Sequence, residues 1–426
     1  MSKPIFVISG PFDTYSGYGA RGRDVAKAII ESDKYDVKLL FQRWGDCSWG
    51  FIDDNPEWEF LNKHKILNLD SKPDIWMQIT IPIEFQPVGT YNIGCTAGIE
   101  STGCDPAWIE GVNRMNECWV SSNHSNKVFT DLVAERKDQR TGQVVQTIKA
   151  QVPIKTVFEG GHTDIWKKVS TKDSEVVLDD IKEEFCYLFV GHWMAGDLGH
   201  DRKNVGYMVK SFFETFKNKK KKPALLLKAS TGNDSYMSRD ELLNRILKIR
   251  KTVNSDNLPN VYLINGDFTN EELNELYSNP KVKAMVCLTK GEGFGRPLLE
   301  FSFVGKPIIA SGWSGHMDFL NPEFTALLPG ELEPVHPSAA NKWLLKETSW
   351  FKPSDEHVGK VWLDVYSNYK QWSVLGKKQG HYARTNFSFE KMKELITKIL
   401  DESIPTFPKK VDINLPTSNV ELPKLQ

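Results

Sequence analysis

Short apolar runs rich in β-branched residues alternate with helical patterns along nearly the whole chain, and this alternation restricts the possible folds most. Strands separated by helical segments form parallel sheets covered by helices, because a parallel strand pair needs a long crossover connection. The runs form two series, the first beginning at residues 5–9 and the second beginning afresh at residues 186–191. The expected strands are residues 5–9, 37–41, 74–79, 91–95, 117–121 and 155–158, then 186–191, 224–228, 261–264, 282–288 and 307–310. The sequence therefore predicts an α/β protein with two doubly wound domains of similar size.

Shifts in composition suggest where these domains begin and end. Residues 167–184 are polar and charged, so we expect a first domain at residues 1–168, a linker at 169–184 and a second domain at 185–387. A closing helix at 388–402 is expected to pack back on the first domain, and the proline-containing residues 403–426 to form an extended tail. Residues 135–151 are polar around one turn signal, which predicts a surface excursion. Two such domains leave a cleft at the carboxyl ends of both sheets, where open α/β sheets bind ligands.

Charge and hydrophobic pattern exclude several classes of protein. Lys and Arg number 54 against 55 Asp and Glu, so no global field attracts the chain to nucleic acid or membrane. No apolar stretch is long enough for a spanning helix, and the N-terminal apolar run is too short for a signal peptide. The six cysteines form no CxxC pair, which predicts buried free thiols in a reducing cytoplasm rather than disulfides or zinc ligands.

Residues 289–318 form the most informative stretch, TKGEGFGRPLLEFSFVGKPIIASGWSGHMD. An apolar strand ends before it, and Pro297 stands where a first-turn proline opens a helix. Gly291, Gly293 and Gly295 let the backbone approach a ligand closely, and the helix start suits a phosphate. Glu292 and Glu300 are eight residues apart, in places where carboxylates can accept hydrogen bonds from sugar hydroxyls. Taken alone, a tight turn with a surface salt bridge explains the same residues.

This stretch resembles the signature of retaining GT-B glycosyltransferases, in particular glycosyltransferase family 4. The matching segments are EGFGRPLLE at 292–300, GKPIIAS at 305–311 and WSGHMD at 313–318. The resemblance implies a GT-B fold of two Rossmann-like domains, a UDP-sugar as co-substrate, no cofactor beyond it and no metal. It places Glu292 near the transferred sugar and Glu300 near the ribose. The remaining donor-binding residues that it implies here are Gly293, Phe294, Gly295, Arg296, Pro297 and Leu298.

Further segments of the second half are similar to the same family. Asp267 and Phe268, in the turn NGDFT, match its base-binding turn, and Lys203 falls on its diphosphate-binding lysine. His192 stands where an arginine is usual, so Arg202 or Lys228 is expected to supply the second cation.

The first half carries a glycine-rich loop, GPFDTYSGYGARG at 10–22, which resembles the family's loop facing the diphosphate. Its implied donor contacts are Gly17, Tyr18 and Gly19. Glu100, with Asp13 behind it, is the candidate for a polar contact to the transferred sugar, and a hydrogen-bonded loop carboxylate is the alternative for each. The resemblance also implies retention of configuration, in which the leaving phosphate itself takes the acceptor proton and Lys203, Arg202 and the helix start stabilise the developing charge.

Two features suggest nucleic acid as the acceptor. Residues 217–222 hold five lysines in six positions, and residues 42–60 place Arg43 among aromatic residues that include Trp44 and Trp49. The lysine run can equally be a solvated loop, and the aromatic segment can bind a sugar ring or pack over the first domain.

The opening ISGPFDTYSGYGARGRD also resembles glycosyltransferases of tailed bacteriophages, some of which transfer glucose or arabinose to 5-hydroxymethylcytosine in DNA. Our first hypothesis is therefore a DNA glycosyltransferase with double-stranded DNA as its acceptor. The alternatives are a transferase for a polysaccharide, lipid-linked or small-molecule acceptor, and an inactive sugar-nucleotide-binding protein.

Overall fold

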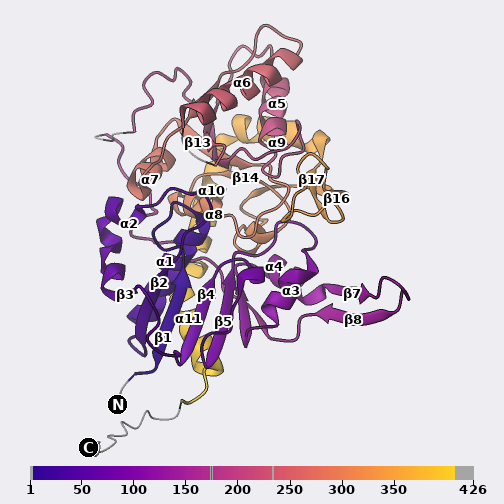
Figure 1. The fold of residues 1–426 in the computed structure, drawn as a ribbon. Helices are drawn as coiled ribbons and strands as arrows, with labels where there is room; N and C mark the ends of the chain where they lie inside the picture. Colours follow the sequence, from indigo (N-terminus) through magenta and orange to yellow (C-terminus); the bar gives the residue numbers. More distant parts are fainter. Residues whose placement is uncertain (1–2, 173, 175, 233–234, 408–426) are drawn as a thin grey trace, which may run out of the picture.

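The computed structural model describes residues 3–172, 174, 176–232 and 235–407. It contains two α/β domains, each built on a parallel sheet, with the first domain below the second in Figure 1. Each sheet carries helices on its faces, so the predicted α/β class is confirmed.

The first domain is built on seven parallel strands in the order β3-β2-β1-β4-β5-β6-β9. Apolar residues of β1 are almost fully buried, as expected for a strand covered on both faces. The strands are β1 (Ile5–Gly10), β2 (Asp36–Phe41), β3 (Lys65–Ile66), β4 (Ile75–Ile79), β5 (Tyr91–Thr96), β6 (Glu117–Val120) and β9 (Ile154–Thr156). The helices are α1 (Gly17–Glu31), α2 (Phe51–Asp54), η1 (Pro56–His64), η2 (Pro82–Glu84), α3 (Pro106–Val112) and α4 (Asn123–Asp131).

The second domain is built on six parallel strands in the order β12-β11-β10-β13-β14-β15. Its strands are β10 (Cys186–His192), β11 (Ala224–Ser230), β12 (Val261–Ile264), β13 (Val282–Cys287), β14 (Ile308–Ser311) and β15 (Ala326–Leu328). Its helices are α5 (Val205–Phe216), α6 (Tyr236–Thr252), α7 (Asn270–Ser278), α8 (Arg296–Val304), η3 (Gly315–Asp318), α9 (Asp355–Ser367) and α10 (Tyr369–Asn386). Phenylalanines, a tyrosine and a tryptophan from α5, β10 and α9 pack together in its core.

Two antiparallel strand pairs form small sheets of their own. The polar excursion expected at 135–151 forms the hairpin of β7 (Val133–Lys137) and β8 (Val144–Lys149), which extends sideways from the first domain in Figure 1. The second hairpin, β16 (Gly330–Pro334) and β17 (Ser349–Pro353), was not expected, and neither were β3 and β15. These elements have only two to five residues each, too few for a clear period-two pattern.

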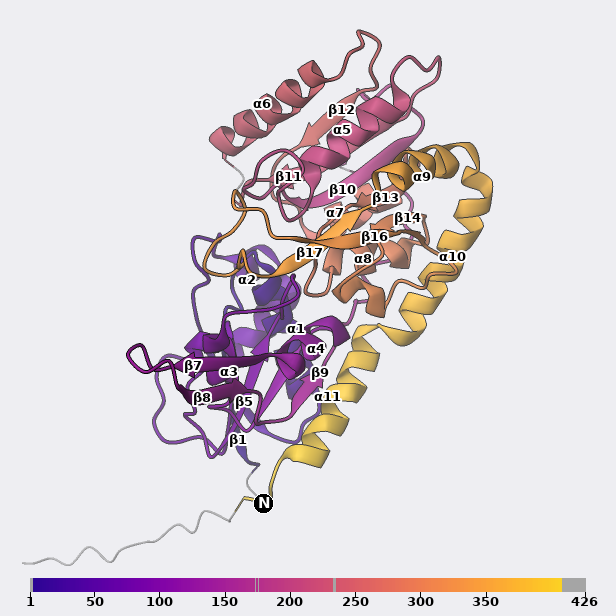
Figure 2. The same cartoon turned by 90° about the vertical axis from the view of Figure 1, so that its right-hand side faces the viewer.

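The chain returns to the first domain at its end. Figure 2 shows α10 and then α11 (Phe389–Ser403) running down one side of both domains. Met392 and Ile396 of α11 are buried in the core of the first domain, beside α1. At the crossing, the Gly161 N–H donates to the Phe387 carbonyl (2.9 Å), and the Phe389 N–H donates to the Gly161 carbonyl (2.8 Å).

The predicted linker at 169–184 forms no helix or strand among its described residues. Leu178 and Ile181 are buried against the second sheet, so this segment lies on the surface of the second domain. Residues 408–426 of the expected tail lie outside the described residues. Within the described part of the chain, no helix is both long and apolar enough to cross a membrane.

Candidate active site

The glycine-rich loop after β13 lies directly against the loop after β5 of the first domain. A Cβ on Gly291 would stand 1.7 Å from the Glu100 carbonyl oxygen, and one on Gly293 would stand 2.6 Å from the Ala97 carbonyl oxygen. These two glycines are therefore needed for the close contact between the domains. The sequence had predicted that they are needed for the close approach of a ligand. Gly295 has φ +97° and precedes α8, a conformation that favours glycine.

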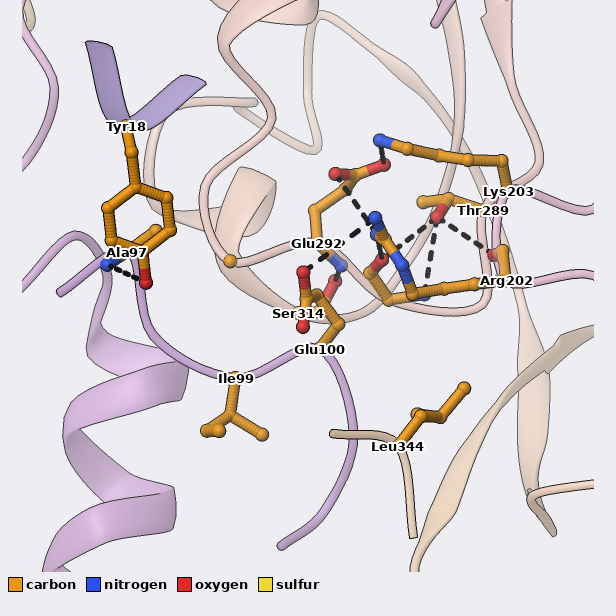
Figure 3. A network of polar contacts seen from close by, with 12 residues as sticks. Tyr18, Ala97, Ile99, Glu100, Arg202, Lys203, Thr289, Glu292, Ser314 and Leu344 are labelled. Atoms are coloured by element: carbon orange, nitrogen blue, oxygen red, sulfur yellow. Dashed lines mark hydrogen bonds and ion pairs between the residues drawn. The ribbon is translucent and has the colours of Figure 1, made fainter. Parts of the chain in front are cut away.

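The meeting point of the two loops holds a cluster of charged side chains (Figure 3). Lys203 Nζ donates to Glu292 Oε1 (2.5 Å), and Arg202 Nη1 lies 3.7 Å from Glu292 Oε2. Arg202 also donates to the Gly291 carbonyl (2.9 Å) and lies 3.7 Å from Glu100 Oε1. Four of the five residues proposed as catalytic are thus brought together from both domains.

The electrostatics of this cluster keep Glu292 ionised. Burial by itself raises the pKa of the Glu292 carboxyl, but the adjacent Lys203 and Arg202 cations outweigh it and lower the pKa to about 2. The Glu292 N–H donates to Ser314 Oγ (2.9 Å), which fixes the backbone of the loop. The carboxylate is therefore a hydrogen-bond acceptor that is held in one place beside Lys203.

Asp13, the fifth proposed catalytic residue, has a different role in the structure. Its Oδ1 accepts the Ile52 N–H (2.8 Å), and its carbonyl accepts the Gly50 N–H (3.0 Å). The side chain is 7 % exposed, so it holds the segment before α2 in place. The alternative of a hydrogen-bonded loop carboxylate fits these contacts.

The glycine-rich loop of the first domain leads into α1, and Tyr18 of this helix contacts the end of β5. The Tyr18 hydroxyl contacts Thr96 Oγ1 (2.8 Å) and accepts the Ala97 N–H (3.2 Å). Its ring stacks on Trp44, with ring centroids 4.0 Å apart. Gly17 has open space where a Cβ would stand, whereas a Cβ on Gly19 would be 2.4 Å from the Thr14 carbonyl oxygen. Of these two glycines, Gly17 alone has open space beside its Cα for a ligand.

The aromatic segment proposed for the acceptor lies over this same loop. Arg43 stands 5.2 Å from the ring centroid of Trp49, and Trp49 forms a β-bridge with Thr14. Trp49 is 38 % exposed. The segment packs on the first domain and still presents an aromatic surface to solvent.

Lys228 and the base-binding turn lie together at the end of β11. Lys228 Nζ donates to the Gly266 carbonyl and lies 5.0 Å from the ring centroid of Phe268. His192, which ends β10, contacts Ser230 Oγ through Nδ1 (2.9 Å). Asp267 has a polar or electrostatic partner as well. Lys228 thus lies beside the turn that the resemblance assigns to the base.

Two residues near the start of α8 that were expected at the donor, Phe294 and Leu298, have buried side chains. Leu298 is 2 % exposed, and its N–H donates to the Gly295 carbonyl (3.0 Å), so neither its side chain nor its N–H is available to a donor. Phe294 is 3 % exposed and packs on Phe319, which leaves only its backbone for such a contact. Pro297 lies in the first turn of α8, as expected.

Arg296 and Glu300 are in contact with each other on α8. Arg296 Nε donates to Glu300 Oε1 (2.9 Å), and its Nη1 donates to Asp24 of α1 (2.6 Å). Arg296 therefore contacts the first domain, and Glu300 is held by an arginine. Burial raises the pKa of Glu300 to about 7, although Arg296 acts in the opposite direction.

Sequence reasoning did not single out His316, which follows the S-G turn at 314–315. His316 is fully buried, and its Nε2 contacts the Ser311 carbonyl oxygen (2.6 Å), while its Nδ1 has no hydrogen-bond partner. The His316 Cβ lies 3.1 Å from the position that a Cβ on Gly295 would take, so His316 packs against the loop that carries Glu292. The sequence signal that could have identified this residue is the histidine in the segment WSGHMD. Among the described residues, no group of three or more His, Cys, Asp or Glu side chains is arranged to hold a metal ion.

Comparisons with known proteins bear on the fold. No protein-family profile and no curated protein sequence matches the chain. Solved structures do: Anabaena HepE in complex with UDP-glucose is 12 % identical with a TM-score of 0.61, over 94 % of this chain and 100 % of that one. The fold is GT-B.

Two further solved structures share the GT-B fold. Sucrose-phosphate synthase from Thermosynechococcus elongatus is 12 % identical with a TM-score of 0.62, over 94 % of this chain and 99 % of that one. WaaG, a glycosyltransferase involved in lipopolysaccharide biosynthesis, is 12 % identical with a TM-score of 0.55, also over 94 % and 99 %. At such identities the likeness concerns the GT-B architecture alone.

Proposed function

We propose that this protein is a glycosyltransferase that moves a sugar from a UDP-sugar to an acceptor hydroxyl. The observation that carries the proposal is the contact of Glu292 with Lys203 and Arg202 where the two domains meet. A carboxylate and two cations at this edge of an α/β sheet suit a ligand with hydroxyls at one end and a diphosphate at the other. The GT-B structures with bound UDP-glucose and UDP support the choice of donor.

The cluster suggests how a donor would be bound. The diphosphate competes with Glu292 for Lys203, and Glu292 is then released to accept a hydrogen bond from a sugar hydroxyl. Negative charge grows on the phosphate as the bond to the sugar breaks, and fixed cations stabilise it without any reorganisation. Removing one such fixed donor typically lowers kcat about 10²–10³-fold.

We propose retention of configuration with attack from the face that the phosphate leaves. The bond between the anomeric carbon and the phosphate oxygen breaks, the acceptor oxygen bonds to that carbon, and its proton passes to the departing phosphate. This scheme needs no carboxylate nucleophile. Lys203 and Arg202 support it, because cations beside the leaving phosphate stabilise the negative charge that develops there.

For the acceptor we propose 5-hydroxymethylcytosine in double-stranded DNA, with glucose or a pentose such as arabinose as the transferred sugar. The lysine run at 217–222 does not support this part of the proposal. It precedes β11, whereas Lys228 and the charged cluster lie where the strands end, and Lys217 pairs with Glu214 (2.6 Å). The run is therefore a solvated loop at the edge of the sheet that faces away from the candidate site.

Other features beside the cluster support a large acceptor. A cavity of about 810 Å³ lies between the domains, and Trp313, which lines it, also borders Gly291. The first strand of the β7–β8 hairpin forms part of its rim. Residues 133–149 carry four basic side chains against two acidic ones, on a two-stranded ribbon that a DNA major groove can admit. A cavity of this size can hold a nucleotide turned out of the duplex.

The test is transfer to duplex DNA that contains 5-hydroxymethylcytosine, with UDP-glucose and UDP-arabinose supplied separately. Mass spectrometry of the released nucleosides is expected to show a gain of one hexose or one pentose. Lys203→Met and Glu292→Gln are expected to abolish the gain, whereas Lys360→Met, at an exposed Lys–Glu pair on α9, is expected to preserve it. UDP release with other acceptors but not with DNA would contradict the DNA acceptor, and no release with any acceptor would refute the enzyme.

A further inference from the structure

A buried charge network joins the two domains beside the candidate donor site. Its centre is Arg296, whose guanidinium contacts Asp24 Oδ2 (2.6 Å) and Glu300 Oε1 (2.9 Å) and lies 3.7 Å from Glu159 Oε2. Asp24 Oδ1 in turn contacts His162 Nε2 (2.8 Å). The three carboxylate residues and His162 are each at most 6 % exposed. Because a buried charge is costly unless it is paired, the contacts among these side chains hold the network together.

The members of the network come from elements of both domains. Asp24 belongs to α1, which begins at the glycine-rich loop of the first domain, and Arg296 opens α8 of the second. Glu159 and His162 lie where the chain crosses between the domains, and the His162 ring stacks on Phe389 at the start of α11 (4.6 Å). The Asp24–Arg296 ion pair is therefore a direct link between α1 and α8.

Arg296 also favours the ionised form of Glu300. Burial raises the pKa of Glu300 to about 7, and Arg296 is the first group that opposes this rise. An ionised Glu300 accepts hydrogen bonds from ribose hydroxyls, whereas a protonated one would offer a single donor. The role proposed for Glu300 thus depends on an arginine next to it in a fixed position.

We propose that Asp24 and Arg296 are positioning residues: Asp24 holds Arg296 across the domain interface, and Arg296 holds the Glu300 carboxylate for the ribose of the bound nucleotide. The inference rests on the proposed function, since it assumes a uridine nucleotide at this site. It goes further by making recognition of the ribose depend on a residue of the other domain, which itself need not touch the ligand.

The test compares binding of UDP with binding of 2′,3′-dideoxy-UDP by calorimetry. For the wild type, removing the ribose hydroxyls is expected to weaken binding about tenfold or more, as for hydrogen bonds to a charged group. Asp24→Asn is expected to reduce this ratio to within about threefold, by weakening UDP binding more than dideoxy-UDP binding. Arg296→Lys, which keeps a cation beside Asp24 but lacks Nε, is expected to do the same. Both variants are expected to fold. Asp24→Asn leaves Glu159 and Glu300 beside Arg296, and Arg296→Lys keeps a cation beside the three carboxylates.

A control separates positioning from general loosening of the structure. Asp401→Asn removes an exposed ion pair between α11 and Lys34 of the first domain, and it is expected to leave the UDP to dideoxy-UDP ratio unchanged. If Asp24→Asn and Arg296→Lys weaken the binding of UDP and of dideoxy-UDP equally, the ion pair of Asp24 and Arg296 only holds the domains together and the inference is overturned. If the wild type binds UDP without preference over dideoxy-UDP, the ribose contact of Glu300 fails and the inference fails with it. If the wild type does not bind UDP, the proposed function itself fails.

Discussion

Removing Lys203 is expected to destabilise the fold as well as to abolish transfer. Glu292 and Lys203 have side chains only 8 % and 15 % exposed, and their charged atoms are 2.5 Å apart. Lys203→Met leaves the Glu292 carboxylate buried with Arg202 alone, 3.7 Å away. An uncompensated buried charge is costly, whereas removal of both charges is often tolerated.

The size of the effect follows from the pKa of Glu292, which falls from an ordinary value of 4.5 to about 2. At 1.36 kcal/mol per pKa unit, this difference corresponds to about 3 kcal/mol of stabilisation from the two cations net of burial. Because Arg202 remains, we expect Lys203→Met to lower the free energy of unfolding by about 2–3 kcal/mol. Lys203→Met combined with Glu292→Gln is expected to recover most of this loss, while transfer stays absent.

The assay is urea unfolding of both single variants and the double variant at pH 7, with a matched cycle at the exposed pair of Lys360 and Glu356. That exposed pair is expected to contribute at most about 1 kcal/mol. If the losses of Lys203→Met and Glu292→Gln simply add in the double variant, the two charges are not coupled and the reasoning is refuted.

The same pair predicts a dependence on pH. A carboxyl whose pKa is lowered by folding stabilises the fold above its unfolded pKa, near 4.5, and this contribution is lost as the pH falls through its folded pKa, near 2. The wild type is therefore expected to lose stability between pH 4.5 and 2 more steeply than Glu292→Gln. Equal slopes for the two proteins over this range would contradict the lowered pKa.

Three further predictions test other parts of the structure. Gly291→Ala is expected to separate the domains, since its Cβ would stand 1.7 Å from the Glu100 carbonyl oxygen; small-angle X-ray scattering that shows no expansion would contradict this. Tyr18→Phe removes the hydrogen bonds to Thr96 Oγ1 and the Ala97 N–H and is expected to lower the free energy of unfolding by about 1–3 kcal/mol; an unchanged value in urea unfolding would contradict this. Replacing the basic residues of the β7–β8 hairpin by Gln is expected to reduce the salt dependence of DNA binding, whereas the same change at residues 217–222 is expected to leave it unaltered; the reverse result would return the lysine run to the acceptor site.

Much of the fold and part of the site could be predicted from the sequence, because both depend on local patterns. Each of the eleven expected strands coincides with an observed strand to within two residues at either end, since buried parallel strands are continuous apolar runs. The stretch at 289–318 predicted a strand, a glycine-rich loop and a helix opened by Pro297, and the structure contains all three. Lys203 and Glu292 were each singled out as single residues, and they prove to be in contact.

The orientation of individual side chains could not be predicted in the same way. Arg296 belongs to the EGFGRPLLE segment and was expected at the donor, yet it contacts Asp24, which lies 272 residues earlier. The lysine run at 217–222 was interpreted either as a contact to nucleic acid or as a solvated loop, and its place before β11 fits the solvated loop. Nothing in the residues next to Arg296 encodes its contact with Asp24.

The sequence by itself therefore determined that there are two sheets, the order of strands and helices along the chain, and the loops that carry glycine, glutamate and lysine. These follow from hydrophobic period, turn residues and helix-start residues, which act over a few positions. Only the tertiary structure decided that Glu100 meets Arg202, that Gly291 is needed for contact between the domains, and that Arg296 links α8 to α1. Such contacts depend on how two separately folded domains pack, and electrostatic partners are chosen by distance in space and by burial, which local patterns do not specify.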